Sequence, residues 1–231
     1  MTRDKLRTPN SELRAEVICG LYAIADAHWN PAPTLADLVR MFLDGGCRLV
    51  QLRMKSDPAN PEEGLENRVR GVAREIMGLK EGYDFTFIVN DYPRVALEVG
   101  ADGIHVGQGD MPVEELRSLV GRGMIVGYSS HDIEEAKRAV SAGADYVSFG
   151  AIFPTSTKGP GHPVQGLARL RELSQVVEVP VVAIGGIRRE NVRQVIEAGA
   201  AAAAMITALS QAPDVVDETA WFVGAIGEVQ R

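Results

Sequence analysis

The chain has 231 residues, of which 45% are hydrophobic and 24% are charged, and its net charge is −7. These values are ordinary for a globular protein and exclude the disordered and collagen-like classes. The acidic balance argues against nonspecific nucleic-acid binding, because such binding needs a basic face that neutralises phosphates.

The first residues are polar. Residues 1–16 lack the apolar centre of a signal peptide, and no later apolar run approaches the length of a membrane span. We therefore expect a cytoplasmic protein without a membrane partner, in which residues 1–16 form an N-terminal extension and residues 17–231 form one domain. Cys19 and Cys47 are too few for a disulfide framework or a thiolate metal site, and we expect both to be buried and reduced.

Short runs rich in Val and Ile alternate with longer segments whose apolar residues recur at spacings of three and four, a pattern typical of a parallel sheet covered by helices. In chain order, the predicted strands are 17–25, 48–53, 85–90, 103–106, 124–128, 145–150, 181–184 and 201–206. The predicted helices are 34–46, 62–82, 113–123, 133–144, 167–177 and 189–200. Eight such units in a chain of this length predict an α/β fold, namely a single-domain (β/α)8 TIM barrel.

In a TIM barrel the loops that follow the strands gather on one face, and that face holds the active site. After the second predicted strand, Gln51, Arg53 and Lys55 occupy alternating positions, so their side chains share one side of the strand. Two cations and an amide on one side suit a polyanionic ligand. The simpler alternative is a solvated strand end, since Lys and Arg are usually exposed.

Acidic residues follow the next two strands. The third ends in Asn90 and Asp91, and Asp110 lies in the loop after the fourth. Two carboxylates at neighbouring strand ends suit Mg²⁺, which takes one or two carboxylates together with substrate phosphates. Each Asp is alternatively a helix N-cap, because Asp110 stands shortly before Pro112. The pairing favours the metal.

Hydroxyl and imidazole groups come next. Ser129 and Ser130 follow the fifth strand, where both are able to bond a ligand, or Ser130 is able to cap the helix that begins near Ile133. His105 and His131 have no second ligand at metal-binding spacing. We interpret both histidines as structural or supporting groups.

The stretch "FGAIFPTSTKGPGH" (149–162) follows the sixth strand. Thr155, Thr157 and Lys158 offer hydroxyl donors and a cation, while Gly159 and Gly161 permit movement or close backbone approach. Such a loop is typical of a lid that closes on a phosphorylated compound.

The last two strands end in a glycine pair and in a short turn. Gly185 and Gly186 leave backbone N–H groups uncovered, and the turn at Ile206 and Thr207 begins another element whose N-terminus attracts anions. The loops after strands seven and eight are the usual phosphate site of this architecture.

Taken in order, "QLRMK", "VNDYP", "GIHVGQGD", "GYSSH", "GADYVSFGAIFPTSTKG", "VVAIGGI" and "MITALSQA" resemble the thiamine phosphate synthase family, from about Gly20 to Asp214. The resemblance implies a transferase that joins 4-amino-2-methyl-5-hydroxymethylpyrimidine diphosphate to 4-methyl-5-(2-phosphoethyl)thiazole and releases diphosphate. It implies Mg²⁺ as cofactor and these two small molecules as substrates. The oligomeric state stays open, and a homo-oligomer is compatible with the sequence.

The resemblance also implies a role for each matching residue. Asp91 and Asp110 hold Mg²⁺ on the diphosphate, and Arg53, Ser129 and Lys158 act on the leaving group. The residues that contact the pyrimidine diphosphate are Gln51, Arg53, Lys55, Asn90, Ser129 and Lys158. The residues that meet the thiazole phosphate are Thr155, Thr157, Gly186, Ile206 and Thr207.

Two alternatives remain. A thiazole tautomerase of the same fold has its catalytic histidine at the position of His131, and a noncatalytic protein that binds thiamine precursors keeps the fold without the chemistry. The complete set of acidic and basic residues favours the synthase. Tyr92 and Thr207 depart from the residues often found in the family, and we expect little effect from Thr207 because it keeps a hydroxyl and a backbone donor.

Overall fold

The computed structural model describes residues 16–30, 32–55, 63–155 and 163–231. In these ranges eight parallel strands pair in chain order, and β8 pairs with β1 to close a barrel. The strands are β1 (Gly20–Asp26), β2 (Leu49–Arg53), β3 (Thr86–Asn90), β4 (Gly103–Val106), β5 (Ile125–Ser130), β6 (Tyr146–Phe149), β7 (Val181–Ile184) and β8 (Ala202–Met205). The predicted TIM barrel is confirmed.

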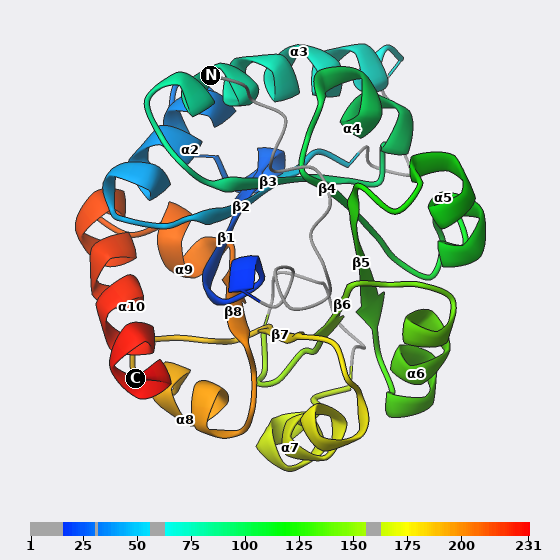
Figure 1. Cartoon of the computed structure of the whole chain (residues 1–231). Helices are drawn as coiled ribbons and strands as arrows, with labels where there is room; N and C mark the ends of the chain where they lie inside the picture. The colour runs from blue at the N-terminus through cyan, green and yellow to red at the C-terminus, as the bar shows by residue number, and fades with distance from the viewer. Residues whose placement is uncertain (1–15, 31, 56–62, 156–162) are drawn as a thin grey trace, which may run out of the picture.

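The helices form a ring outside the barrel (Figure 1). They are α2 (Leu35–Asp44), α3 (Leu65–Gly78), α4 (Pro93–Val99), α5 (Val113–Val120), α6 (Ile133–Ser141), α7 (Gly166–Val176), α8 (Val192–Glu197), α9 (Thr207–Ser210) and α10 (Val215–Gln230), with 3-10 turns at Ala27–Trp29 and Leu79–Glu81. The sequence did not predict α4 or α10. Helix α4 is short and begins at a proline. Helix α10 follows α9 with no strand between them, so it lies outside the alternating pattern of strands and helices. None of the helices in the described ranges is long and apolar enough to span a membrane.

Two apolar clusters hold the barrel together. The larger fills the space between the strands and the surrounding helices, and the smaller lies within the barrel around Tyr22, Ile88, Ile125 and Tyr146. Strand residues alternate between these two clusters, as the period of a strand requires. The barrel interior is therefore packed with side chains, and a ligand has to bind at the carboxyl ends of the strands.

Two strand ends differ from the prediction by more than one residue. The first strand starts at Gly20 and not at Val17, because Gly20 has a φ of +78° and turns the chain there. Cys19 precedes this turn and is exposed, so the prediction that it is buried was wrong, whereas Cys47 is buried. The strand β5 extends to Ser130, which makes Ser129 and Ser130 strand residues.

Gly127 makes room for a large buried ring inside the barrel. Gly127 in β5 is the register partner of Tyr146 in β6, and a Cβ atom at Gly127 would lie 2.1 Å from Tyr146 Cζ. Replacing Gly127 with alanine should therefore displace the Tyr146 ring. We expect Gly127→Ala to lower the free energy of unfolding by about 1–3 kcal/mol, as measured by urea denaturation.

Gly71 in α3 is the control, because a Cβ atom there meets nothing within 4 Å. Gly71→Ala should raise the free energy of unfolding by about 0.5–1 kcal/mol, since alanine is the better helix former. Equal stability of the two variants would contradict the packing role of Gly127.

Candidate active site

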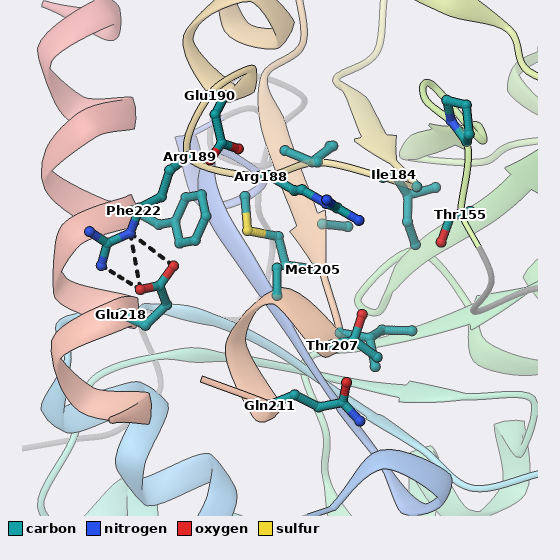
Figure 2. A pocket seen from close by; sticks show the side chains of 17 residues that line it. Thr155, Ile184, Arg188, Arg189, Glu190, Met205, Thr207, Gln211, Glu218 and Phe222 are labelled. Carbon is teal, nitrogen blue, oxygen red and sulfur yellow. Dashed lines mark hydrogen bonds and ion pairs between the residues drawn. The ribbon is translucent and has the colours of Figure 1, made fainter. Parts of the chain in front are cut away.

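Among the described residues, two adjoining cavities open at the carboxyl ends of the strands. The inner cavity is lined by Tyr22, Ile24, Gln51, Arg53, Asn90, His105, Ser129, Ser148, Val182, Ile184, Ala204 and Ile206. The outer cavity, of about 430 Å³, lies between the ends of β7 and β8, the loop after β6, and α10 (Figure 2). Ile184, Ala204 and Ile206 line both.

Gln51 and Arg53 of β2 line the inner cavity, whereas Lys55 follows the strand and lines neither cavity. Gln51 is only 3% exposed, so a solvated strand end is excluded for it. The Arg53 guanidinium pairs with the buried carboxylate of Asp26 at the end of β1, and Lys55 Nζ lies 3.0 Å from Asp91 Oδ2. Arg53 is thus paired with the last residue of β1, and Lys55 is paired with the residue that follows β3.

Neither Asp91 nor Asp110 caps a helix, so the N-cap alternative is wrong for both. The N-cap of α4 is Tyr92 and that of α5 is Pro112. Asp91 has a φ of 67°, a conformation uncommon for a residue other than glycine. The Oδ2 atom of Asp110 accepts a hydrogen bond of 2.7 Å from the backbone N–H of Gly107. Both carboxylates are held by the loops themselves.

The electrostatics of this pair fit a divalent cation. Burial raises the pKa of Asp91 to about 6, Lys55 opposes that shift, and the neighbouring Asp110 adds to it. Ionising Asp91 in the folded protein therefore costs free energy, which a bound cation offsets. The described residues contain no cluster of three or more His, Cys, Asp or Glu side chains suited to a metal. A metal ion held by two carboxylates has its remaining coordination positions open to water and phosphate oxygens, which is the pattern that Mg²⁺ favours.

The Asn90 side chain has an unmet hydrogen-bonding requirement. Asn90 is 5% exposed and lines the inner cavity. Its Nδ2 atom is buried and finds no acceptor within the described part of the chain. Because a buried donor without a partner is costly, this amide is suited to donate to a ligand atom in the cavity.

A chain of hydrogen bonds crosses the floor of the inner cavity. Gln51 Nε2 donates to the Tyr22 hydroxyl at 2.9 Å, which lies 2.8 Å from the Tyr146 hydroxyl. The Tyr146 hydroxyl lies 2.9 Å from His105 Nδ1, and His105 Nε2 lies 2.8 Å from Ser129 Oγ. Ser129 Oγ is in turn 3.2 Å from Ser148 Oγ, so the chain joins five strands.

The direction of these bonds follows from the Gln51 amide. Tyr22 accepts from Gln51, so its own proton goes to Tyr146, and the Tyr146 proton then goes to His105 Nδ1. Burial raises the pKa of both phenols, which keeps both protonated. This network assigns neutral His105 the tautomer with its proton on Nε2, which donates to Ser129. The sequence interpretation of His105 as a supporting group agrees with this arrangement.

Ser130 and His131 do not belong to the two cavities. Ser130 Oγ donates to the backbone carbonyl of Ser148 at 3.0 Å, and Asp132 caps α6 instead, so the capping role suggested for Ser130 is wrong. The backbone N–H of His131 donates to Glu135 at 2.7 Å. His131 lines neither cavity, a position that does not favour the tautomerase alternative.

The outer cavity is shaped by close contact between two loops. The backbone N–H of Phe153 donates to the carbonyl of Gly185 at 3.0 Å. Gly186 has a φ of +67°, and a Cβ atom there would lie 2.6 Å from the carbonyl oxygen of Pro154. Only glycine fits this position, which places Thr155 beside the end of β7.

The end of β8 completes the outer cavity. Ile206 and Thr207 line it together with Thr155 and Gly186, and α9 begins at Thr207 as predicted. The structure therefore brings together four of the five residues assigned to the thiazole phosphate. The fifth, Thr157, and the predicted cation Lys158 lie outside the described residues.

Sequence reasoning missed several polar residues of the site. Asp26 ends an apolar strand as a buried carboxylate, a signal that was available. Tyr22, Tyr146 and Ser148 lie within apolar runs, where nothing in the sequence distinguishes them from core residues.

Known proteins share this arrangement of sequence and fold. A model of the thiamine monophosphate synthase family matches residues 21–209. The chain belongs to this family. It is 40% identical over 211 residues to a thiamine-phosphate synthase of Shouchella clausii, covering 91% of this chain and 98% of that one. A relative in Methanosarcina barkeri with the same description is 40% identical, covering 91% of each chain.

A solved structure supports the same family assignment. The thiamine phosphate pyrophosphorylase from Pyrococcus furiosus superposes with a TM-score of 0.82 at 34% identity, covering 95% of this chain and all of that one. As a thiamine monophosphate synthase family member, the protein is an enzyme, a transferase of thiamine biosynthesis that acts on small molecules.

The hydrogen-bond chain should contribute to stability. Tyr146→Phe leaves the Tyr22 proton without its acceptor and His105 Nδ1 without its donor, so we expect the free energy of unfolding to fall by about 1–3 kcal/mol. The ¹⁵N resonances of His105 should shift, because loss of the Tyr146 donor frees the other tautomer. Tyr83→Phe is the control: its exposed hydroxyl donates to Asp44 at 2.6 Å, and its loss should change stability by less than about 0.5 kcal/mol. Unchanged ¹⁵N resonances of His105 in Tyr146→Phe would contradict the assigned tautomer.

Proposed function

We propose that this enzyme condenses 4-amino-2-methyl-5-hydroxymethylpyrimidine diphosphate with 4-methyl-5-(2-phosphoethyl)thiazole to give thiamine phosphate and diphosphate. The observation that carries the proposal is the buried Asn90 amide, which opens into the inner cavity beside Asp91 and has no acceptor among the described residues. A polar heteroaromatic ring with an attached diphosphate supplies acceptors at that point.

The inner cavity suits the pyrimidine. Its floor offers the hydroxyl and amide groups of Gln51, Ser129 and Ser148, while Val182 and Ile184 provide apolar contact for the faces of a ring. Because phenols, hydroxyls and amides line the floor, this cavity recognises a neutral polar ring by hydrogen bonds.

The rim suits the diphosphate. Arg53 and Lys55 supply two positive charges, and Asp91 and Asp110 are the residues that would hold Mg²⁺. When bound, Mg²⁺ neutralises negative charge on the diphosphate oxygens. Lys55 Nζ lies 3.0 Å from Asp91 Oδ2 in the structure, and it would be free to contact a phosphate oxygen if Asp91 held Mg²⁺. The resemblance implies that Lys158 contacts the diphosphate and that Thr157 meets the thiazole phosphate.

The chemistry follows from this distribution of charge. The bond between the methylene carbon of the pyrimidine and the diphosphate oxygen breaks, and its electron pair leaves with the diphosphate. The aminopyrimidine delocalises the positive charge that remains, and the thiazole nitrogen donates its lone pair to form the new carbon–nitrogen bond. Arg53 stabilises the leaving group where negative charge develops, so the reaction needs no protein nucleophile.

The outer cavity suits the thiazole phosphate. Thr155, Gly186 and Thr207 offer hydroxyl and backbone donors at the ends of β6, β7 and β8, the usual phosphate position of this architecture. The shared wall of Ile184, Ala204 and Ile206 is apolar, and it suits the thiazole ring between the phosphate and the pyrimidine.

An assay with both substrates tests the reaction. Purified protein, Mg²⁺ and both compounds should yield thiamine phosphate and diphosphate in equal amounts, and omission of either substrate should abolish thiamine phosphate formation. Chromatography for thiamine phosphate and an enzymatic assay for diphosphate measure both products. Isomerisation of a thiazole without condensation would support the tautomerase alternative instead.

The carboxylates should govern the metal requirement. Asp91→Asn keeps the shape of the side chain and removes its charge, so the Mg²⁺ concentration needed for half-maximal turnover should rise at least about tenfold. Asp84→Asn is the matched control, because Asp84 is exposed at the opposite end of β3. An unchanged Mg²⁺ dependence in Asp91→Asn would remove Asp91 from the metal site.

A further inference from the structure

Arg188 and Arg189 are consecutive residues after β7, yet their side chains point in opposite directions (Figure 2). The Arg189 guanidinium faces α10, where its Nε donates to both carboxylate oxygens of Glu218 at 3.0 Å. It also lies 4.6 Å from the centre of the Trp221 ring. The Arg188 guanidinium extends instead into the outer cavity, on the side of Ile184.

The two arginines also differ in their charge partners. The hydrogen-bonded Glu218 raises the pKa of Arg189, and the nearby Glu190 adds to this shift. The Glu218 carboxylate is thus paired with Arg189. No side chain in the described part of the chain forms an ion pair or hydrogen bond with the Arg188 guanidinium. Arg188 therefore adds a positive charge without an ion-pair partner to the lining of the cavity, which also includes Glu190.

Apart from Arg189, which is paired with Glu218, the other donors that line the outer cavity are uncharged. Thr155 and Thr207 supply hydroxyls, and Gly186 supplies backbone that no side chain covers. With a volume of about 430 Å³ the cavity is large enough for a small molecule, beyond what a phosphate group alone requires. A planar guanidinium can bind two oxygens of a phosphate at once, which the hydroxyls cannot do.

We propose that Arg188 binds the phosphate group of the thiazole substrate and makes the enzyme select the phosphorylated thiazole over the corresponding alcohol. The inference rests on the proposed function for the identity of the substrate. It adds a specificity-determining residue that the sequence interpretation did not assign. Among the described residues that line the outer cavity, Arg188 is the cation that has no ion-pair partner within the described ranges, so it can contact the phosphate directly.

The size of the effect follows from the chemistry of the contact. Loss of a hydrogen-bonded ion pair to phosphate should weaken binding of the phosphorylated thiazole about 10- to 100-fold. The alcohol carries no charge, so its binding should change less than about threefold. The ratio of kcat/KM for phosphate over alcohol should therefore fall by at least about tenfold.

The experiment compares the wild type with Arg188→Met, Arg188→Lys and Arg193→Met. Steady-state kinetics are measured with the thiazole phosphate and with its alcohol, at saturating pyrimidine diphosphate and Mg²⁺. Arg188→Met should raise the KM for thiazole phosphate while kcat stays within about twofold, and Arg188→Lys should restore part of the loss. Arg193 pairs with Glu228 at 2.6 Å on the outer surface, so Arg193→Met removes the same charge outside the cavity and should leave the ratio unchanged.

Two outcomes would overturn the proposal. One is an unchanged KM for thiazole phosphate in Arg188→Met. The other is an equal fall in kcat/KM for phosphate and alcohol, which would show that Arg188 does not recognise the phosphate. Thermal unfolding of each variant establishes that it is folded.

Titration calorimetry separates this inference from the proposed reaction. If the wild type makes no thiamine phosphate, the proposed function fails, and thiazole phosphate is still titrated into the wild type and Arg188→Met. Binding that is lost in Arg188→Met but retained in Arg193→Met supports the phosphate contact. Equal binding by all three proteins, or none by the wild type, overturns it.

Discussion

Parallel pairing around a closed barrel is the constraint on which the site depends. Each strand ends on the same ring, so residues that are distant in sequence become lateral neighbours. The register shows this directly, because Asp26 pairs with Arg53 in adjacent strands and their side chains form an ion pair. Ser129 and Ser148 are likewise register partners, and their hydroxyls lie 3.2 Å apart. The polar contacts of the site are consequences of strand register.

This dependence explains what the sequence could and could not predict. The strand ends were recognisable because apolar runs stop at polar residues, as at Asn90 and Asp91. The hydrogen-bond chain was not recognisable from the sequence, because a tyrosine within an apolar run, such as Tyr146, cannot be distinguished there from a phenylalanine of the core. Its partners Tyr22 and His105 are 124 and 41 residues away. Only the closed register shows that these three side chains meet.

The hydrogen-bonded side chains and the Lys55–Asp91 ion pair lie in different parts of the site. The floor around Tyr22, Tyr146 and His105 is a network of hydrogen-bonded side chains, and burial keeps the two phenols protonated. The ionised side chains lie above them, where Lys55 contacts Asp91. A buried charge near the floor would need a partner of its own, so this separation lets the floor recognise a ring by hydrogen bonds while the rim handles a polyanion.

Small side chains in β8 connect the two cavities. Ala204 lines both of them and is 3% exposed, and it stands beside Tyr22 in the register of β1 and β8. A larger residue at this position would take up space in the cavities that Ala204 lines, because the barrel interior has no free space to receive it. The small alanine therefore leaves space in both cavities, which share the apolar wall of Ile184, Ala204 and Ile206. Two dissimilar molecules can then approach each other within one barrel, each held by groups of its own kind.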